Sequence, residues 1–177
     1  MIESCYWKEE LLRIAGSIRR VTKPPRWTER TQCIVERDLA VGFFLLRRLI
    51  ELNLVSSATT DRQLHIFCYK ARGKRVTKLN NHRLEELYDM ENEVAATKKP
   101  LYVSNQFLHA YTSFVARDES RNWSDVLLVS DFDRNDCIWR VPIPVIESLF
   151  RVASKDYPHY VQQTFNPKSG DYDVRAN

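Results

Sequence analysis

Glycine is scarce in this sequence, with four among 177 residues, where an average usage of about 7% would give about a dozen. A dinucleotide-binding fingerprint and a Walker loop both need glycines a few residues apart, because the backbone must approach a phosphate without an intervening Cβ. A G-x-S-x-G nucleophile elbow needs the same close spacing. The glycines stand at positions 16, 42, 73 and 170, so the sequence lacks all three motifs.

Cysteine is also infrequent, and its distribution excludes the usual metal motifs. No two cysteines form the C-x-x-C pair that cysteine-based metal motifs usually contain. Isolated cysteines inside apolar stretches are most often small buried hydrophobes. We therefore expect a reducing, cytoplasmic environment for Cys5, Cys33, Cys68 and Cys137 and no metal bound by them. Because the glycine-rich motifs are also missing, we expect no cofactor.

Long hydrophobic runs are absent. Charged residues appear within the first ten positions, so no apolar signal-peptide region is present. The most apolar run, residues 39–46, ends at Arg47, far short of the ~18 residues that a membrane-spanning helix needs. We expect a soluble protein that does not enter a membrane.

The first third of the chain predicts two helices. Apolar residues recur at steps of three and four between Trp7 and Ile18, and Pro24 ends this pattern. Thr28 stands where an N-cap is expected, and the second pattern continues to about Leu54. This long helix is apolar over most of its circumference, which predicts burial on more than one side. Gly42 within it predicts close packing of another element.

The remainder predicts short helices and antiparallel strands. We expect a strand over 64–71, a short helix from about 81, a helix from 104 through 115, and a hairpin of strands 126–132 and 137–141. A helix follows from 144, and 161–174 reads as a last hairpin or a loosely docked end. This order is typical of an α+β protein. We expect one domain over 1–177, in which an N-terminal helical pair with a long central helix packs with further helices and a small antiparallel sheet.

The clearest charge feature lies between positions 70 and 78, which hold five cations and no acid, against a net charge of +4 for the whole chain. A basic loop beside an aromatic side chain can hold a phosphate backbone with a base stacked on the ring. The alternative is a solvated loop, neutralised within the chain by the acidic residues of 85–93. The candidate nucleic-acid-binding residues are Tyr69, Lys70, Arg72, Lys74, Arg75 and Lys78.

Two histidines are candidates for acid–base chemistry. His109 lies four residues after Asn105 on a predicted helix, so the two share a face, and His82 precedes Arg83 at the start of another. Converging on a phosphodiester, these groups could act as a metal-independent ribonuclease. The N-x-x-x-H spacing is similar to that of HEPN-type ribonuclease domains, but the arginine that usually precedes their histidine is missing. The alternative is structural, with His109 hydrogen-bonded inside a helix interface and Asn105 near the N-terminus of its helix.

An acidic stretch, Asp131, Asp133, Asn135 and Asp136, begins like a calcium loop. The sixth position is Asp136 rather than glycine and the twelfth is Pro142 rather than glutamate, so the match ends there. Asp and Asn also hydrogen-bond their own backbone in turns. A hairpin turn is the better interpretation.

The sequence holds four tryptophans. The periodic segments around Trp7 and Trp139 predict core positions for both. The other two lie in predicted loops near arginines, which is the composition of a binding anchor, although a tryptophan covering a helix end is an equal alternative. The candidate partner-binding residues are Arg26, Trp27, Arg121 and Trp123.

Segments 6–15, 82–89 and 105–109 together resemble a group of short, uncharacterised bacterial proteins with no known activity. The resemblance implies a bacterial cytosolic single-domain protein and supplies no site residue. The leading hypothesis is a non-enzymatic binding module that acts through a protein partner or self-association. Nucleic-acid binding at 70–78 and ribonuclease activity are the alternatives.

Overall fold

The computed structural model describes residues 4–177. Its helices are α1 (Ser4–Ile18), α2 (Glu29–Glu51), α3 (Ser57–Thr60), α4 (Leu84–Leu87), α5 (Pro100–Leu108) and α6 (Ile143–Lys155). Its strands are β1 (Leu64–Ala71), β2 (Tyr88–Lys98), β3 (Ala110–Arg117), β4 (Trp123–Ser130), β5 (Cys137–Pro142), β6 (Val161–Asn166) and β7 (Asp171–Ala176). The α+β class is confirmed.

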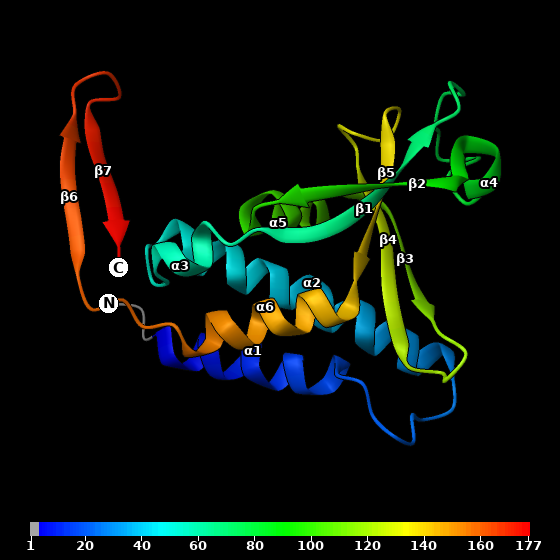
Figure 1. Cartoon of the computed structure of the whole chain (residues 1–177), viewed down its shortest axis with the longest axis horizontal. Coiled ribbons are helices and arrows are strands. Elements are labelled where there is room, and N and C mark those ends of the chain that lie inside the picture. Colours follow the sequence, from blue (N-terminus) through cyan, green and yellow to red (C-terminus); the bar gives the residue numbers. More distant parts are fainter. Residues whose placement is uncertain (1–3) are drawn as a thin grey trace.

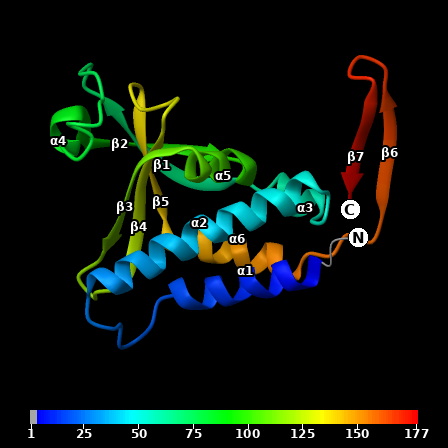
Figure 2. The ribbon, with the colours of Figure 1, turned by 180° about the vertical axis from the view of Figure 1, so that it is seen from behind.

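Helices α1, α2 and α6 lie side by side, and the five-stranded sheet crosses one end of them (Figures 1 and 2). As predicted, Thr28 caps α2. Its hydroxyl accepts a hydrogen bond from the Thr31 backbone N–H, and the Thr31 hydroxyl accepts one from the Thr28 backbone N–H. Gly42 packs against the buried Phe150 ring of α6, and a Cβ there would collide with that ring. Within residues 4–177, no helix combines the length and apolar composition that a bilayer crossing requires.

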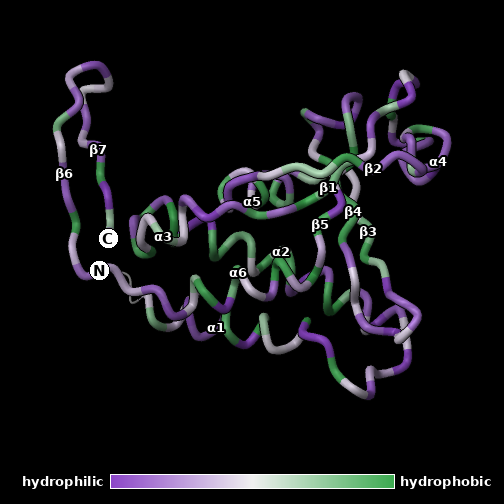
Figure 3. The backbone as a smooth tube through the Cα atoms, in the orientation of Figure 1, coloured by the Kyte–Doolittle hydropathy of each residue, from purple (hydrophilic) through white to green (hydrophobic). Residues whose placement is uncertain are grey.

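The main sheet has the strand order β2-β1-β5-β4-β3, and every neighbouring pair is antiparallel. Alternate residues of β1, namely Leu64, Ile66 and Cys68, are buried in the core shared with the helices. Figure 3 shows the hydrophobic residues concentrated along these helices and the central strands. A second, smaller cluster, of Val76, Leu87, Tyr88, Val129 and Ile138, fastens residues 72–87 to the sheet.

Two predicted helices were wrong in extent. The helix expected over 104–115 begins at Pro100 and ends at Leu108, and Tyr111 and Phe114 belong to β3. Aromatic and β-branched residues favour a strand there once β4 is available as a partner, and Phe114 pairs with Leu127. The helix expected from 81 is a single turn, because Tyr88 begins β2, an edge strand too exposed to show an apolar alternation.

The last two strands form a separate two-stranded sheet, called here the terminal hairpin. It projects from the body beyond α3 (Figures 1 and 2). At its base, the Asn177 carbonyl accepts hydrogen bonds from the backbone of His159 and Tyr160, and Ser57 Oγ donates to Asn177 Oδ1. Of the two alternatives expected for this end of the chain, the structure shows the hairpin.

Candidate functional site

The loop between α1 and α2 and the turn between β3 and β4 form one surface, called here the basic end and defined as residues 19–30 and 118–122. The Val21 backbone N–H donates to Asn122 Oδ1 at 2.9 Å, and Asn122 Nδ2 donates to the Val21 carbonyl at 3.2 Å. Arg117 Nη1 donates to the Pro25 carbonyl at 3.2 Å. Because Asn122 is buried, these bonds fix the loop against the turn.

Trp27 projects from this loop. Its side chain is 55% exposed, and its Nε1 donates to Gln32 Oε1 at 3.1 Å. The capping box formed by Thr28 and Thr31 follows directly and fixes the start of α2. The indole is therefore exposed and also restrained from both sides, which lowers the conformational entropy that a partner would have to remove.

The basic end, which contains Trp27, also carries six cations. Within residues 4–177, Arg20 alone among them has a carboxylate partner, Asp118, at 2.7 Å. A hydrogen bond from the Ser120 hydroxyl holds the pKa of Asp118 below its usual value. The exposed cations of this end that have no carboxylate partner among the described residues are Arg19, Lys23, Arg26, Arg30 and Arg121.

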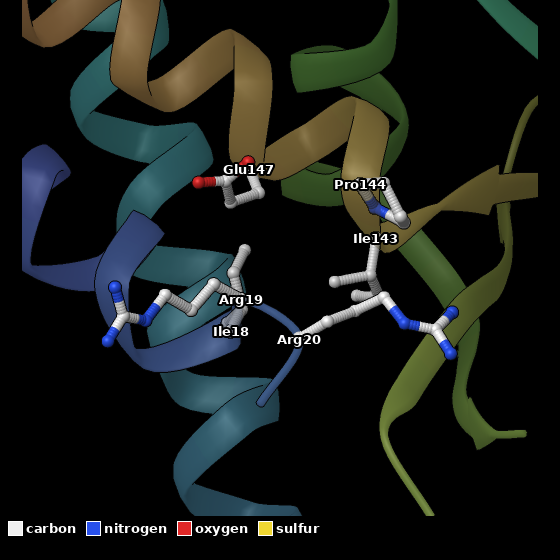
Figure 4. Close-up of a pocket in the computed structure, with 6 residues that line it drawn as sticks. All are labelled: Ile18, Arg19, Arg20, Ile143, Pro144 and Glu147. Atoms are coloured by element: carbon white, nitrogen blue, oxygen red, sulfur yellow. The ribbon is translucent and has the colours of Figure 1, made fainter. Parts of the chain in front are cut away.

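A pocket of about 290 Å³ lies beside this end, between the last turn of α1 and the first turn of α6. Ile18 and Ile143 supply apolar surface, and Glu147, which is paired with Arg151, lies across from them. In Figure 4 the guanidinium groups of Arg19 and Arg20 extend in opposite directions. They do not converge on one small anion, so the cations suit an extended partner better than a small ligand.

Trp123 corrects one prediction. It is the first residue of β4 rather than a loop residue, and it is only 9% exposed. The Arg117 guanidinium lies over its ring, 4.1 Å from the centroid. Trp123 therefore packs beneath the basic end, whereas Arg26, Trp27 and Arg121, which is at the tip of the β3–β4 turn with a φ of 65°, are exposed on it.

Residues 70–78, called here the basic segment, differ in their charge environment. Arg72 Nη2 lies 3.1 Å from Asp89 Oδ1, and Lys74 Nζ lies 3.5 Å from Glu86 Oε2. Acidic residues from 85–93 thus neutralise part of the segment, as the sequence suggested. The cations left without a carboxylate partner among residues 4–177 are Lys70, Arg75 and Lys78.

The outer face of the sheet next to the basic segment carries two carboxylates. Arg140 lies over the Phe67 ring and pairs with Glu93 at 2.6 Å and with Asp125 at 2.5 Å. The Tyr69 hydroxyl donates to Glu93 at 2.8 Å, and the Arg140 guanidinium holds the pKa of Glu93 below its usual value. Sequence reasoning missed this network because its members come from different strands. It places negative charge beside the aromatic ring that would stack a base.

The four candidate ribonuclease residues fall into two separate pairs. His82 and Arg83 precede α4, which packs on β2, whereas Asn105 and His109 lie at the end of α5, which packs on α2 and β4. Figures 1 and 2 both separate α4 from α5, and no hydrogen bond or ion pair joins the two pairs in the described part of the chain. The structure does not bring them into one site.

The structural alternative for these residues was also wrong in its details. His109 is exposed rather than buried in a helix interface, and Asn105 lies near the C-terminus of α5 rather than its N-terminus. The Asn105 carbonyl accepts the backbone N–H of His109 at 3.0 Å. The Asn105 side-chain oxygen is buried without a hydrogen-bond partner among the described residues.

The acidic stretch after β4 is a turn, as predicted. The Asp133 carbonyl accepts hydrogen bonds from the backbone of Asp136 and Cys137. Its carboxylate accepts from the Tyr102 hydroxyl at 2.8 Å and from Gln106 Nε2 at 2.7 Å, which ties the turn to α5. In the described residues, 4–177, no group of three or more His, Cys, Asp or Glu side chains is arranged to hold a metal ion.

Two buried charged groups belong to the helix bundle. Lys8 donates to the backbone carbonyls of Leu54 and Asp156, and burial lowers its pKa. Burial of Asp38 opposes ionisation, but hydrogen bonds from Arg37 and other donors outweigh it and keep the Asp38 pKa below its usual value. Buried groups with shifted pKa values are often catalytic. Here the partners are structural: Lys8 binds carbonyls just beyond the ends of α2 and α6, and Asp38 binds Arg37 of its own helix and Ser17 of α1.

No protein-family model, curated protein or solved structure matches this chain. Its function has to be argued from its own surface. Of the surfaces described, the basic end combines an exposed, restrained tryptophan with cations that have no carboxylate partner among residues 4–177.

Proposed function

We propose that this protein is a non-enzymatic binding module, and that its basic end binds an acidic segment of a partner protein with Trp27 as the central anchor. The observation that carries the proposal is Trp27 itself, 55% exposed in a loop fixed by hydrogen bonds. Tryptophan and arginine are the residue types most enriched among the energetically dominant contacts of protein interfaces.

The surrounding charges favour a protein partner over a nucleic acid. Glu29, Asp118 and Glu119 are interspersed among the cations of the basic end, and each would repel a continuous phosphate backbone. An acidic peptide carries its carboxylates on flexible side chains that can turn away from Glu29, Asp118 and Glu119, and each can form a bidentate pair with one guanidinium. Single-strand platforms also present successive aromatic rings to successive bases, whereas Trp27 is the one tryptophan of this end that is exposed.

The loop also favours binding through its rigidity. Asn122 and Arg117 fasten the loop to the β3–β4 turn, and Gln32 orients the indole. The loop and the indole are already ordered before a partner binds, so binding costs less conformational entropy than it would for a flexible loop. The unpaired cations would also speed the encounter with an acidic partner, most strongly at low salt.

The proposal can be tested with poly-L-glutamate as the probe, by isothermal titration calorimetry. We expect Trp27→Ala and Arg26→Glu each to weaken binding about tenfold, which corresponds to ~1.4 kcal/mol. Each variant has a matched control. Phe132→Ala removes an exposed ring elsewhere, at a position 91% exposed, and Arg75→Glu reverses an exposed cation in the basic segment. Both should change the affinity less than about twofold, as surface substitutions away from a site usually do.

Two results would contradict the proposal. An equal loss in Arg75→Glu would mean that the probe responds to overall charge rather than to the basic end. A single-stranded oligonucleotide that binds more tightly than the probe, and loses its affinity in Arg75→Glu but not in Arg26→Glu, would instead favour nucleic-acid binding at the basic segment.

A further inference from the structure

The terminal hairpin contains only two strands, and most of its side chains are exposed. Phe165 is 54% exposed and Tyr172 is 58% exposed. A two-stranded hairpin is at best marginally stable in water, and three or more strands with an apolar face are normally needed. The hairpin thus lacks the additional strands that would stabilise it.

Its two faces differ in polarity. The cross-strand partners Phe165 and Tyr172 share one face, where their rings stack edge to face with centroids 5.3 Å apart. Because side chains alternate along each strand, the register assigns the other residues as well. The apolar face holds Val161, Gln163, Phe165, Tyr172, Val174 and Ala176, and the polar face holds Gln162, Thr164, Asn166, Asp171, Asp173 and Arg175.

Its two edges differ as well. Strand β7 carries Asp171, Asp173 and Arg175, and its end, together with Gln162 of β6, lines a hollow shared with α3. Strand β6 has the sequence VQQTFN, without a charged residue or a proline. Edge strands of natural proteins are usually protected from pairing by charges, proline or bulges. The β6 edge has none of these protections, and within residues 4–177 it pairs with β7 alone.

The β6 sequence is complementary to itself in an antiparallel register. When Gln163 faces Gln163 of a second copy, Val161 faces Phe165 of that copy, and by symmetry the apolar pair occurs twice. Gln162 likewise faces Thr164. Aromatic pairs with β-branched residues are among the favourable cross-strand combinations, and no like charges meet. This is the arrangement that a two-fold axis through Gln163 requires.

We propose that β6 pairs with β6 of a second copy of this chain, joining the two terminal hairpins into one four-stranded antiparallel sheet. The two copies would supply each other with the strands that each hairpin lacks. This inference is independent of the proposed partner at the basic end, because it involves no residue of that surface. One six-residue strand buries less than the ~1,200–2,000 Å² of a standard stable interface, so the dimer should depend on protein concentration.

Sedimentation velocity over a concentration series of the full chain tests the proposal. We expect the wild-type protein to pass from monomer to dimer as its concentration rises. Gln163→Lys and Gln163→Glu should each raise the dissociation constant several-fold, because like charges then face each other at the axis. Ser169→Lys, which adds the same charge in the hairpin turn, should leave the dissociation constant unchanged.

A mixture of the two Gln163 variants separates lost pairing from lost folding. The lysine of one copy then faces the glutamate of the other, so we expect the mixture to form a heterodimer more readily than either variant forms a homodimer. Hydrogen exchange of the β6 amides should slow in the mixture. A wild-type protein that stays monomeric at all concentrations, a dimer unaffected by Gln163→Lys, or a mixture that fails to associate would each overturn the proposal.

Discussion

The basic end and the basic segment are both rich in cations, but their charge environments differ. The basic segment is followed in sequence by an acidic stretch, and the fold brings Asp89 to Arg72 and Glu86 to Lys74. Within the basic end, the loop between α1 and α2 meets the β3–β4 turn, from which only Asp118 forms an ion pair with a cation, Arg20, in the described chain. A run of cations thus stays largely unpaired or is partly neutralised according to what the fold places opposite it.

The two regions are also attached to the body in different ways. Val76, Leu87 and Tyr88 anchor the stretch that contains the basic segment through apolar packing. Hydrogen bonds from Asn122 and Arg117 attach the basic end. Apolar burial and hydrogen bonding contribute different amounts to stability, so substitutions can measure the difference.

The largest effect is expected for Leu87→Ala. Leu87 is 1% exposed, so truncation leaves a cavity and should lower the free energy of unfolding by ~2–5 kcal/mol. Urea denaturation followed by circular dichroism measures the change. Leu79→Ala, at a position 86% exposed in the same stretch, is the matched control and should change stability by less than ~0.5 kcal/mol. Equal effects of the two variants would show that packing does not anchor this region.

A smaller effect is expected for Asn122→Ala at the basic end. The change removes both hydrogen bonds between the Asn122 side chain and the Val21 backbone, and the Val21 N–H and carbonyl lose these partners. The free energy of unfolding should fall by ~1–3 kcal/mol. Hydrogen exchange at the Val21 amide should accelerate, and binding of poly-L-glutamate should weaken as the loop loses its fixed position. Glu119→Ala, on the same turn, is the control for the exchange measurement and should leave the Val21 amide unchanged. Unchanged exchange at Val21 would mean that Asn122 does not hold the loop.

The sequence predicted the elements whose signals are local. The N-cap Thr28, the apolar period of α2 and the β-favouring residues of 64–71 all lie within short windows, and the structure agrees with them. The signals that failed depend on distant partners. Tyr111 and Phe114 fit a helical period until β4 pairs with them, and Trp123 resembles a loop residue until Arg117 covers it.

The candidate site shows the same limit. Arg26, Trp27 and Arg121 could be selected by residue type, because exposed tryptophan and arginine are typical of binding anchors. Their assembly into one surface depends on Asn122, whose hydrogen bonds to Val21 span 101 positions of the sequence. No pattern within a short window contains that contact. The pairing of Arg140 with Glu93 and Asp125 could not be predicted either, because the three residues come from different strands.

The smallest effect is expected when the charges that distinguish the two regions are removed. Glu86→Gln combined with Asp89→Asn should free Lys74 and Arg72 while changing stability by less than ~1 kcal/mol, since both pairs are on the surface. We expect a single-stranded oligonucleotide to bind the double variant several-fold more tightly. Each freed cation that binds a phosphate should also steepen the dependence of log affinity on log salt concentration by ~0.7.

The control for this variant is Glu85→Gln combined with Glu91→Gln, which changes the net charge equally but removes no ion pair to the basic segment. Its effect should be smaller, because Arg72 and Lys74 keep their partners. If both double variants raised the affinity equally, net charge alone would govern binding, and the local pairing that separates the basic segment from the basic end would have no functional consequence. A larger effect in the first double variant would show that Glu86 and Asp89 mask a phosphate-binding loop, whereas at the basic end Asp118 pairs with Arg20 alone among the described cations.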